Sequence, residues 1–213
     1  MMKSTILLIG GAGFIGSNLI SSFIKEGKYK IIVFENEGAD LKRLDIHRDQ
    51  IEVITGDMAD SSFFVYIIEQ FKVSIVIHLV STLLPNSSLD DYLIEFDRVI
   101  KPTIKIINIC ANLNVRFVYF SSGGVIAVAI GKIMRGEQIE IYGDGKNVRD
   151  YIYIDDLCDC CYRLIEDNVV NEIFNIGSGK GYSNSEIISI INDISLEESN
   201  IVYSENRSSD VKS

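Results

Sequence analysis

A glycine-rich segment near the start of the chain, GGAGFIG at residues 10–16, has the residue types and spacing of a phosphate-binding turn. It follows an apolar run, residues 5–9, and opens a run with helical periodicity. A strand, then glycines, then a helix is the order that a dinucleotide-binding turn requires. Gly10 would allow a tight exit from the strand, Gly13 a close approach of a pyrophosphate, and Gly16 close packing of helix on strand. The N–H groups at the helix start would then bind the phosphates.

An acidic side chain stands where such a turn needs one. A second apolar run, residues 29–34, ends in Glu35, about 20 residues beyond the glycines. A carboxylate there can accept hydrogen bonds from both ribose hydroxyls. The alternative is a glycine-rich turn without a ligand, and the flanking strand, the helix and Glu35 together favour the dinucleotide site.

Alternating strands and helices are expected to position these residues. Near-continuous apolar strands separated by helices indicate a parallel sheet that is buried on both faces, so the fold class is α/β with a doubly wound parallel sheet. Ligands bind at the carboxyl ends of such strands, and the glycines, Glu35, Asp57, residues 79–81 and residues 121–122 all fall there. The expected strands are residues 5–9, 29–35, 51–55, 73–80 and 116–120, and the expected helices are residues 13–26, 61–71 and 89–113, the last bent at Pro102.

The second half of the chain has shorter elements. A helix is expected at residues 126–134, a strand at 139–142, a turn at 143–145, a strand at 149–154 and a helix from Asp155 to about Glu166. A short segment at residues 172–176, a helix at 184–194 and a strand at 201–203 complete the pattern. We divide the chain into a first domain, residues 1–124, and a second part, residues 125–213.

Composition excludes several classes of function. The chain has 213 residues, 47% of them hydrophobic, which indicates a globular protein, and its net charge of −10 disfavours nucleic acid as a partner. No stretch reaches the roughly 18 apolar residues that a membrane span needs. The four cysteines are expected to be structural thiols of a reducing cytosol, although Cys158 and Cys161 form a C-x-x-C. With only His47 and His78, neither a metal site nor a hydrolase triad is expected.

These motifs, in this order, resemble the extended short-chain dehydrogenase/reductases, and specifically the NAD-dependent nucleotide-sugar epimerase/dehydratase family of the UDP-glucose 4-epimerase type. The resemblance rests on the glycine motif, on Gly56-Asp57, on HLVS at residues 78–81 and on FVYFSSGG at residues 117–124. It continues through YGDG at 142–145, RDYIYIDD at 149–156, NIG at 175–177 and RSSD at 207–210. It implies a Rossmann fold followed by a small, incomplete substrate-binding part.

The resemblance also implies a cofactor, a substrate and site residues. The cofactor would be NAD, selected over NADP because Glu35 repels a 2′-phosphate, and the substrate a nucleotide sugar, most simply a UDP-sugar. Arg149 and Arg207 would bind its diphosphate, and Ser122 would place a hydroxyl near the nicotinamide. A cytoplasmic homodimer is expected. The implied cofactor-binding residues are Gly10, Gly13, Phe14, Ile15, Gly16, Glu35, Asn36, Asp57, Met58, Leu79, Val80, Ser81 and Ser121.

One family element is missing from the sequence. The family's Tyr-x-x-x-Lys pair lies on a helix after the fifth strand, where the tyrosine exchanges a proton with the sugar. The one such string, from Tyr142 to Lys146, crosses a Gly-Asp-Gly turn and does not share a helical face. Gly124 runs directly into Val125, where the family has several dozen more residues. Either the sequence omits a segment or the protein is shortened and catalytically dead; intact motifs on both sides favour omission.

The leading functional hypothesis is therefore a 4-epimerase, which oxidises the sugar C4 hydroxyl to a 4-keto sugar and reduces it again on the other face. Family dehydratases usually carry an Asp-Glu pair after the fifth strand, where this chain has Gly123-Gly124, which favours an epimerase or a reductase. The alternative from another class is a non-catalytic NAD-binding or scaffold protein. Turnover of a nucleotide sugar would separate the two.

Overall fold

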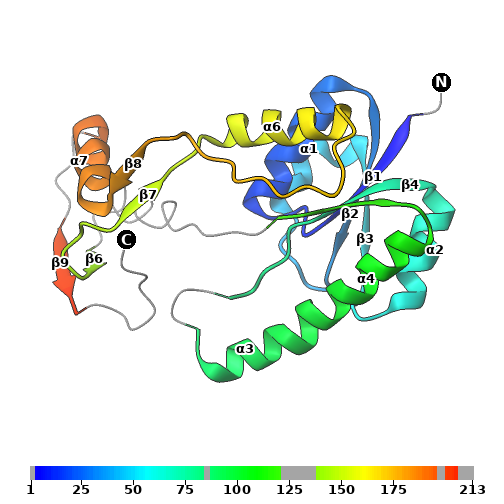
Figure 1. Cartoon of the computed structure of the whole chain (residues 1–213), viewed down its shortest axis with the longest axis horizontal. Coiled ribbons are helices and arrows are strands. Elements are labelled where there is room, and N and C mark those ends of the chain that lie inside the picture. The colour runs from blue at the N-terminus through cyan, green and yellow to red at the C-terminus, as the bar shows by residue number, and fades with distance from the viewer. Residues whose placement is uncertain (1–2, 84–86, 121–137, 196–199, 206–213) are drawn as a thin grey trace. The chain divides into compact units, whose positions relative to one another are not determined.

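The chain folds into two compact units in a computed structural model that describes residues 3–83, 87–120, 138–195 and 200–205. The first unit comprises residues 1–122 together with residues 154–173. The second comprises residues 123–153 together with residues 174–213. The chain therefore leaves the first unit, returns to it for one helix and its following loop, and leaves again (Figure 1).

A five-stranded sheet forms the centre of the first unit. Every neighbouring pair is parallel, and the strand order is β3-β2-β1-β4-β5. The reversal of order between β1 and β4 creates the point at which α/β sheets bind ligands. The strands are β1 (Ser4–Ile9), β2 (Tyr29–Glu35), β3 (Ile51–Thr55), β4 (Val73–His78) and β5 (Arg116–Tyr119).

The side chains of the strands alternate between two hydrophobic cores, one on each face of the sheet. Ile6 and Leu8 point into a core that helices α1 (Phe14–Glu26) and α6 (Ile154–Glu166) cover. Leu7 and Ile9 point into the core on the other face, which is covered by α2 (Ser61–Phe71) and α4 (Lys101–Asn112). Figure 1 shows the α1–α6 pair and the α2–α4 pair on opposite sides of the strands. The doubly wound architecture expected from the sequence is confirmed.

Capping residues explain where the first helices begin and end. Asp60 precedes α2, and its carboxylate accepts a hydrogen bond from the N–H of Phe63 at 3.0 Å. Gly27 follows α1 in the left-handed conformation, with φ of +70°, and its N–H donates to the carbonyl of Phe23. A 3₁₀ segment, Lys42–Gln50, precedes β3 and was not expected from the sequence.

One long helical region runs from Leu89 to Asn112 and passes through α3 (Leu89–Glu95), a π-helical turn (Phe96–Ile100) and α4. The Ser88 side chain caps its start in a reciprocal capping box with Asp91. The π-helical turn ends two residues before Pro102, which has no N–H to donate to the preceding turn. The irregularity thus lies where the sequence predicts a disturbed helix.

Helix α6 is bound to the first unit at its C-terminal end. The Arg116 guanidinium, at the start of β5, donates to the carbonyls of Leu164, Ile165 and Val169 at 2.6 to 2.9 Å. These bonds hold the end of α6 and the loop that follows it against β5. The strand expected at residues 149–154 is wrong beyond Asp150, where the observed strand ends. Ile154 already opens α6, with Asp155 and Asp156 in its first turn.

The second unit contains two small sheets and one helix. β6 (Ile139–Tyr142) pairs in parallel with β9 (Ile201–Ser204), and β7 (Val148–Asp150) pairs antiparallel with β8 (Gly181–Ser183). Ile139 and Ile141 form a small core with Ile188 of α7 (Asn184–Ser195).

The expected element at residues 172–176 forms neither helix nor strand. A strand needs a neighbour for its backbone groups, and among the described residues nothing pairs with this segment, whose Ile173 is 96% exposed. The helix expected at residues 126–134 lies outside the described residues. Of the helices that the structure describes, none combines the length and the apolar character needed to cross a membrane.

Candidate nucleotide-binding site

The loops that follow the first four strands are joined by backbone hydrogen bonds at one edge of the sheet. The N–H of Gly10 donates to the carbonyl of Phe34 at 3.0 Å, and the N–H of Leu79 donates to the carbonyl of Ile9 at 2.9 Å. The N–H of Gly56 donates to the carbonyl of Glu35 at 3.0 Å. The residues predicted to bind the cofactor in these loops therefore share one edge, at the carboxyl ends of the strands.

Glycine is required at two positions of the turn, Gly16 and Gly13, for different structural reasons. A Cβ on Gly16 would lie 2.6 Å from both the Cα and the carbonyl oxygen of Gly11, so only glycine allows α1 to pack on this turn. A Cβ on Gly13 would meet only the carbonyl oxygen of Gly10, at 3.3 Å, and otherwise enters open space. Gly13 therefore keeps free a volume that no side chain of the described chain uses, where a ligand can approach the backbone.

The start of α1 presents free hydrogen-bond donors. The N-cap residue is Gly13, which has no side chain with which to cap the helix, and no acidic residue lies in the first turn. The first N–H with a helical acceptor is that of Ser17, which bonds to the carbonyl of Gly13 at 3.0 Å. Among the described residues, no acceptor is found for the N–H groups of Phe14, Ile15 and Gly16. Three N–H donors and the positive end of the helix dipole thus form a site that suits an anion.

Glu35 lies directly beside this turn. Its Oε1 accepts a hydrogen bond from the N–H of Ala12 at 2.6 Å, a contact that sequence reasoning missed. Burial raises the pKa of the Glu35 carboxyl above its ordinary value, and the Ala12 N–H opposes this by stabilising the charge. Within the described chain Oε2 has no hydrogen-bond partner, so it remains able to accept a bond from a ribose hydroxyl.

A dinucleotide fits this donor set. The unpartnered amides of α1 suit a pyrophosphate, the open space at Gly13 lets it approach, and the free oxygen of Glu35 suits a ribose. The acid and the amides lie close together, since Ala12 bridges the two features.

The remaining predicted cofactor residues lie around the same edge. Asp57 is exposed, and its carboxylate accepts a bond from the N–H of Ala59 at 2.8 Å, which shapes the turn after β3. Asn36 is exposed, Met58 is half-buried, and Leu79 and Val80 are half-buried against the cores on opposite faces of the sheet. Their contacts with a cofactor stay predictions.

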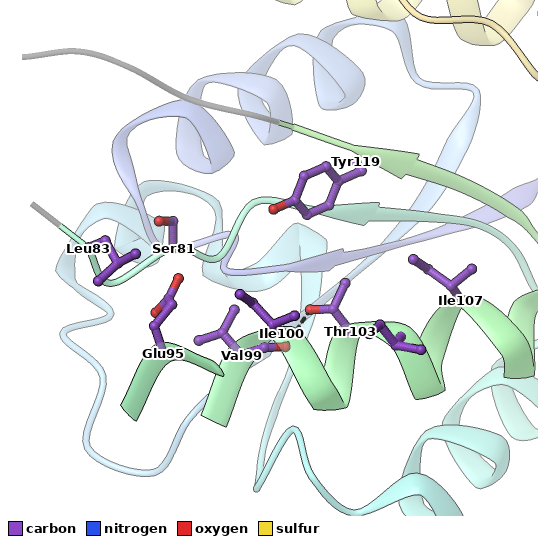
Figure 2. Close-up of a pocket in the computed structure, with 9 residues that line it drawn as sticks. Ser81, Leu83, Glu95, Val99, Ile100, Thr103, Ile107 and Tyr119 are labelled. Carbon is purple, nitrogen blue, oxygen red and sulfur yellow. Dashed lines mark hydrogen bonds between the residues drawn. The ribbon is translucent and has the colours of Figure 1, made fainter. Parts of the chain in front are cut away.

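A cavity of about 360 Å³ lies between the ends of β4 and β5 and the long helical region. Its walls are largely apolar, and Ser81, Glu95 and the Tyr119 hydroxyl supply polar groups (Figure 2). The lining residues are Ser81, Leu83, Glu95, Val99, Ile100, Thr103, Ile104, Ile107 and Tyr119.

His78, at the end of β4, is fully buried beside this cavity. Its Nε2 lies 3.0 Å from the Thr103 hydroxyl, which itself donates to the carbonyl of Val99 at 2.6 Å. The Thr103 hydroxyl has a single hydrogen, which it donates to Val99, so it can only accept from the ring. Nε2 of His78 therefore carries a hydrogen and donates it to the Thr103 oxygen. Burial lowers the pKa of His78 to about 4, so the ring is neutral at neutral pH and has a structural role.

The other predicted site residues lie outside the described part of the first unit. Arg149 lies in the second unit, where it is exposed and donates to the carbonyl of Val148 at 2.8 Å. Ser121, Ser122 and Arg207 lie outside the described residues.

The cysteines of α6 belong to the core rather than to a site. Cys158 and Cys161 are buried against the helix α1 side of the sheet and form no disulfide. Burial raises the pKa of their thiols to about 11 and about 12, which keeps them protonated and unreactive.

Known proteins share this fold over nearly the whole chain. An epimerase structure from Methanothermobacter thermautotrophicus superposes with a TM-score of 0.87 at 20% identity, covering 99% of this chain and 82% of the other. A UDP-glucose 4-epimerase of Bifidobacterium longum, solved with NAD⁺ and UDP, gives a TM-score of 0.83 at 20% identity, covering 98% and 88%. At such identities the likeness shows the fold alone.

Sequence relatives add information about length. A protein of Methanocaldococcus jannaschii, provisionally named a UDP-glucose 4-epimerase, is 25% identical over 253 residues, covering 87% of this chain and 81% of the relative. The dTDP-glucose 4,6-dehydratase of Xanthomonas campestris is 33% identical over 67 residues, only 32% of this chain and 19% of that enzyme. The 253-residue alignment is longer than the 213-residue chain, so the relative contains residues without a counterpart here.

The model of the NAD dependent epimerase/dehydratase family matches the chain in two stretches, residues 6–127 and 123–177. The stretches meet at residues 123–127, the junction where the sequence lacks the expected catalytic helix. Together they cover most of the chain, on both sides of that junction. The chain therefore belongs to the NAD dependent epimerase/dehydratase family.

Proposed function

We propose that this protein is an NAD-dependent nucleotide-sugar epimerase that inverts C4 of a sugar attached to a nucleoside diphosphate, most simply a UDP-sugar. The observation that carries the proposal is the start of α1, where three amides without a described partner lie beside Glu35. This is the donor and acceptor set for a pyrophosphate and a ribose. Relatives named as UDP-glucose 4-epimerases support the substrate class.

The cofactor is NAD rather than NADP in this proposal. The Glu35 carboxylate is half-buried and already bonded to Ala12, so it cannot swing far from the ribose position. A 2′-phosphate would place a second negative charge against this carboxylate in a site of reduced polarity. The repulsion favours a cofactor with a free 2′-hydroxyl.

Each group of the chain has one task. When bound, NAD supplies the acceptor and donor of the hydride. The amides of Phe14, Ile15 and Gly16 hold the pyrophosphate, and Glu35 holds the ribose. Arg149 and Arg207 are proposed to bind the diphosphate of the sugar nucleotide, which suits bidentate guanidinium chemistry, and Ser122 to place a hydroxyl near the reacting carbon.

A second candidate function is a non-catalytic NAD-binding protein. Its specific support is the junction near Gly124, where the Tyr-x-x-x-Lys helix is absent from the sequence and a relative has additional residues. Without this paired tyrosine and lysine, the sequence shows no motif that would transfer the proton at the sugar hydroxyl. A dehydratase or reductase is less favoured, because Gly123-Gly124 stand where dehydratases place two acids.

Turnover measured together with intact mass distinguishes these functions. The purified protein is weighed by mass spectrometry, loaded with NAD and incubated with UDP-galactose, and UDP-glucose is measured by chromatography. A mass above the 23.8 kDa of the sequence together with epimerised product supports the epimerase. A mass of 23.8 kDa, bound NAD and no product supports the non-catalytic protein. Loss of a water molecule from UDP-glucose or dTDP-glucose would identify a dehydratase.

The protein is further proposed to be a homodimer. The long helical region exposes a stripe of six apolar side chains with helical spacing: Leu89, Leu93, Phe96, Ile100, Ile104 and Ile107. Acidic residues, Asp90 and Asp91, lie near its N-terminal end, and basic residues, Lys101 and Lys105, toward its C-terminal end. Antiparallel pairing with a second copy would cover the stripe and bring opposite charges together.

Sedimentation equilibrium tests this pairing. The wild-type protein is expected to sediment as a dimer and Ile104→Glu as a monomer, since Ile104 is 60% exposed in the middle of the stripe. Ile46→Glu is the control, because Ile46 is more exposed but lies in the 3₁₀ segment before β3, outside the apolar stripe. A monomeric wild-type protein would overturn the dimer.

The free, mostly buried cysteines fit a reducing compartment, and we propose the cytoplasm.

A further inference from the structure

A buried carboxylate lies next to the candidate cofactor site and has no role in the function proposed above. Glu95, the last residue of α3, is only 5% exposed and is the one buried acidic side chain among the described residues. An ionised group is costly to bury unless hydrogen bonds compensate for lost hydration. The hydrogen bonds of Glu95 therefore indicate which part of the structure its burial stabilises.

Among the described residues, the hydrogen bonds to the Glu95 carboxylate come from one residue, Thr82, in the loop that follows β4. The N–H of Thr82 lies 3.3 Å from Oε1 and 3.2 Å from Oε2, and the Thr82 hydroxyl also donates to Oε2. Hydrogen bonds to an ionised acceptor are about twice as strong as neutral ones. Glu95 thus binds Thr82 through both its backbone and its side chain, and Figure 2 shows the carboxylate turned toward neighbouring Ser81.

The loop between β4 and Thr82 is the part of the site that packs on the glycine turn. At its start, the Leu79 N–H bonds to the carbonyl of Ile9. In its middle, a Cβ built on Gly10 would lie 2.9 Å from Cγ2 of Val80, so the two residues are in close contact. At its end, Thr82 is bonded to Glu95. The loop is therefore fixed at both ends while its centre contacts the turn that would hold the pyrophosphate.

We propose that Glu95 is a positioning residue that acts through Thr82 to fix the loop of residues 79–81 against the glycine turn, and so sets the affinity for the dinucleotide. This inference rests on the proposed cofactor-binding function. Glu95 does not touch the cofactor in this account. Its removal would free the loop end and leave the Thr82 N–H without its acceptor.

The test compares NAD⁺ affinity across four variants by isothermal titration calorimetry. Glu95→Ala and Thr82→Val are each expected to weaken NAD⁺ binding about tenfold, while Glu95→Gln, which keeps one acceptor oxygen, recovers most of the affinity. Asp97→Ala is the matched control, because Asp97 lies two residues away on the same helical region and pairs with Lys101 at the surface. It is expected to bind NAD⁺ like the wild-type protein.

Amide hydrogen exchange of the ligand-free proteins separates positioning from general destabilisation. In Glu95→Ala we expect faster exchange at residues 79–82, with the strand amides of β1 and β2 unchanged. Acceleration throughout the first unit, or no change in NAD⁺ affinity despite a wild-type protein that binds, would overturn the inference. A wild-type protein that does not bind NAD⁺ would overturn the proposed function instead, and exchange would still decide whether Glu95 orders the loop.

Discussion

The two units of this molecule are stabilised on different scales. The first has a five-stranded sheet with a hydrophobic core on each face, and its strands are among the most buried residues of the chain. The second has two-stranded sheets, and the hydrophobic core of its described residues consists of Ile139, Ile141 and Ile188 with two partly buried neighbours. Because a two-stranded sheet is marginally stable alone, the second unit depends more on individual polar contacts.

The two units also differ in how the chain connects their paired strands. In the first unit, three of the four strand pairs (β1–β2, β2–β3 and β4–β5) join strands that are consecutive in the chain, and in the fourth, β1–β4, Thr5 pairs with Val73. In the second, β6 pairs with β9 some 60 residues later, and part of the chain between them, residues 154–173, belongs to the first unit. The candidate cofactor site is built on the unit with the larger sheet and a hydrophobic core on each face, which suits a site that needs a rigid support.

The largest effect is expected from Gly16→Ala, which should strongly destabilise the first unit. The new methyl group would lie 2.6 Å from the backbone of Gly11, and neither the turn nor α1 can move without disrupting the core. We expect a loss of about 3 kcal/mol or more in unfolding free energy. Urea denaturation followed by circular dichroism measures it. Unchanged stability would show that α1 does not pack on the turn as described.

Gly13→Ala should separate binding from stability in the same turn. Its methyl group meets only the carbonyl oxygen of Gly10, at 3.3 Å, and its φ of −67° suits any residue. The melting temperature is therefore expected to change by no more than roughly 2 °C, while NAD⁺ binding weakens at least about tenfold because the methyl group fills the approach to the helix amides. Equal losses in both quantities would contradict the division of roles between Gly13 and Gly16.

Much of the first unit follows from its sequence, because buried parallel strands are nearly continuous apolar runs. The expected strands at residues 5–9, 29–35 and 51–55 match β1, β2 and β3 to within a residue, and β4 and β5 end one or two residues early. The sequence does not reveal the 3₁₀ segment before β3, whose residues are mostly polar and have no clear period. In the second unit, β8 is only three residues long and depends on β7 for its partner.

The candidate site is predictable where a residue type is tied to backbone geometry, as at Gly13 and Gly16. Contacts between distant side chains are not. Glu35 is marked by its place after β2, yet its bond to Ala12 depends on the packing of two loops. Glu95 stands among apolar residues of α3, which gives no indication that it faces inward toward Thr82.

Lowering the pH from 7 to 5 is expected to have an intermediate effect on stability, and to act through the first unit, which contains both histidines. Burial lowers the pKa of His78 to about 4 from 6.5, so folding excludes a proton that the unfolded chain binds. Its contribution to stability is complete above pH 6.5 and is lost as pH falls toward 4. Between pH 7 and pH 5 we expect the melting temperature to fall by a few degrees more in the wild type than in His78→Gln. Parallel curves would contradict this.

The smallest effect is expected in the second unit, from Asp150→Ala. The Asp150 carboxylate accepts bonds from the Ser178 hydroxyl and from the N–H groups of Ser178 and Gly179, at 2.6 to 2.8 Å. The same bonds lower the pKa of Asp150. Its removal should accelerate amide exchange at residues 178 and 179 while NAD⁺ binding stays unchanged. Loss of NAD⁺ binding would show that the cofactor site is not confined to the first unit.

The most direct test of the account is a calorimetric titration of the wild-type protein with NAD⁺, repeated with NADP⁺ and with Gly13→Ala. We predict saturable binding of NAD⁺ with a micromolar Kd, at least about tenfold weaker binding of NADP⁺, and a similar loss in the variant. These results would place the dinucleotide at the start of α1 with its ribose at Glu35. No binding at about 1 mM NAD⁺, or equal affinity for both cofactors, would contradict the central claim.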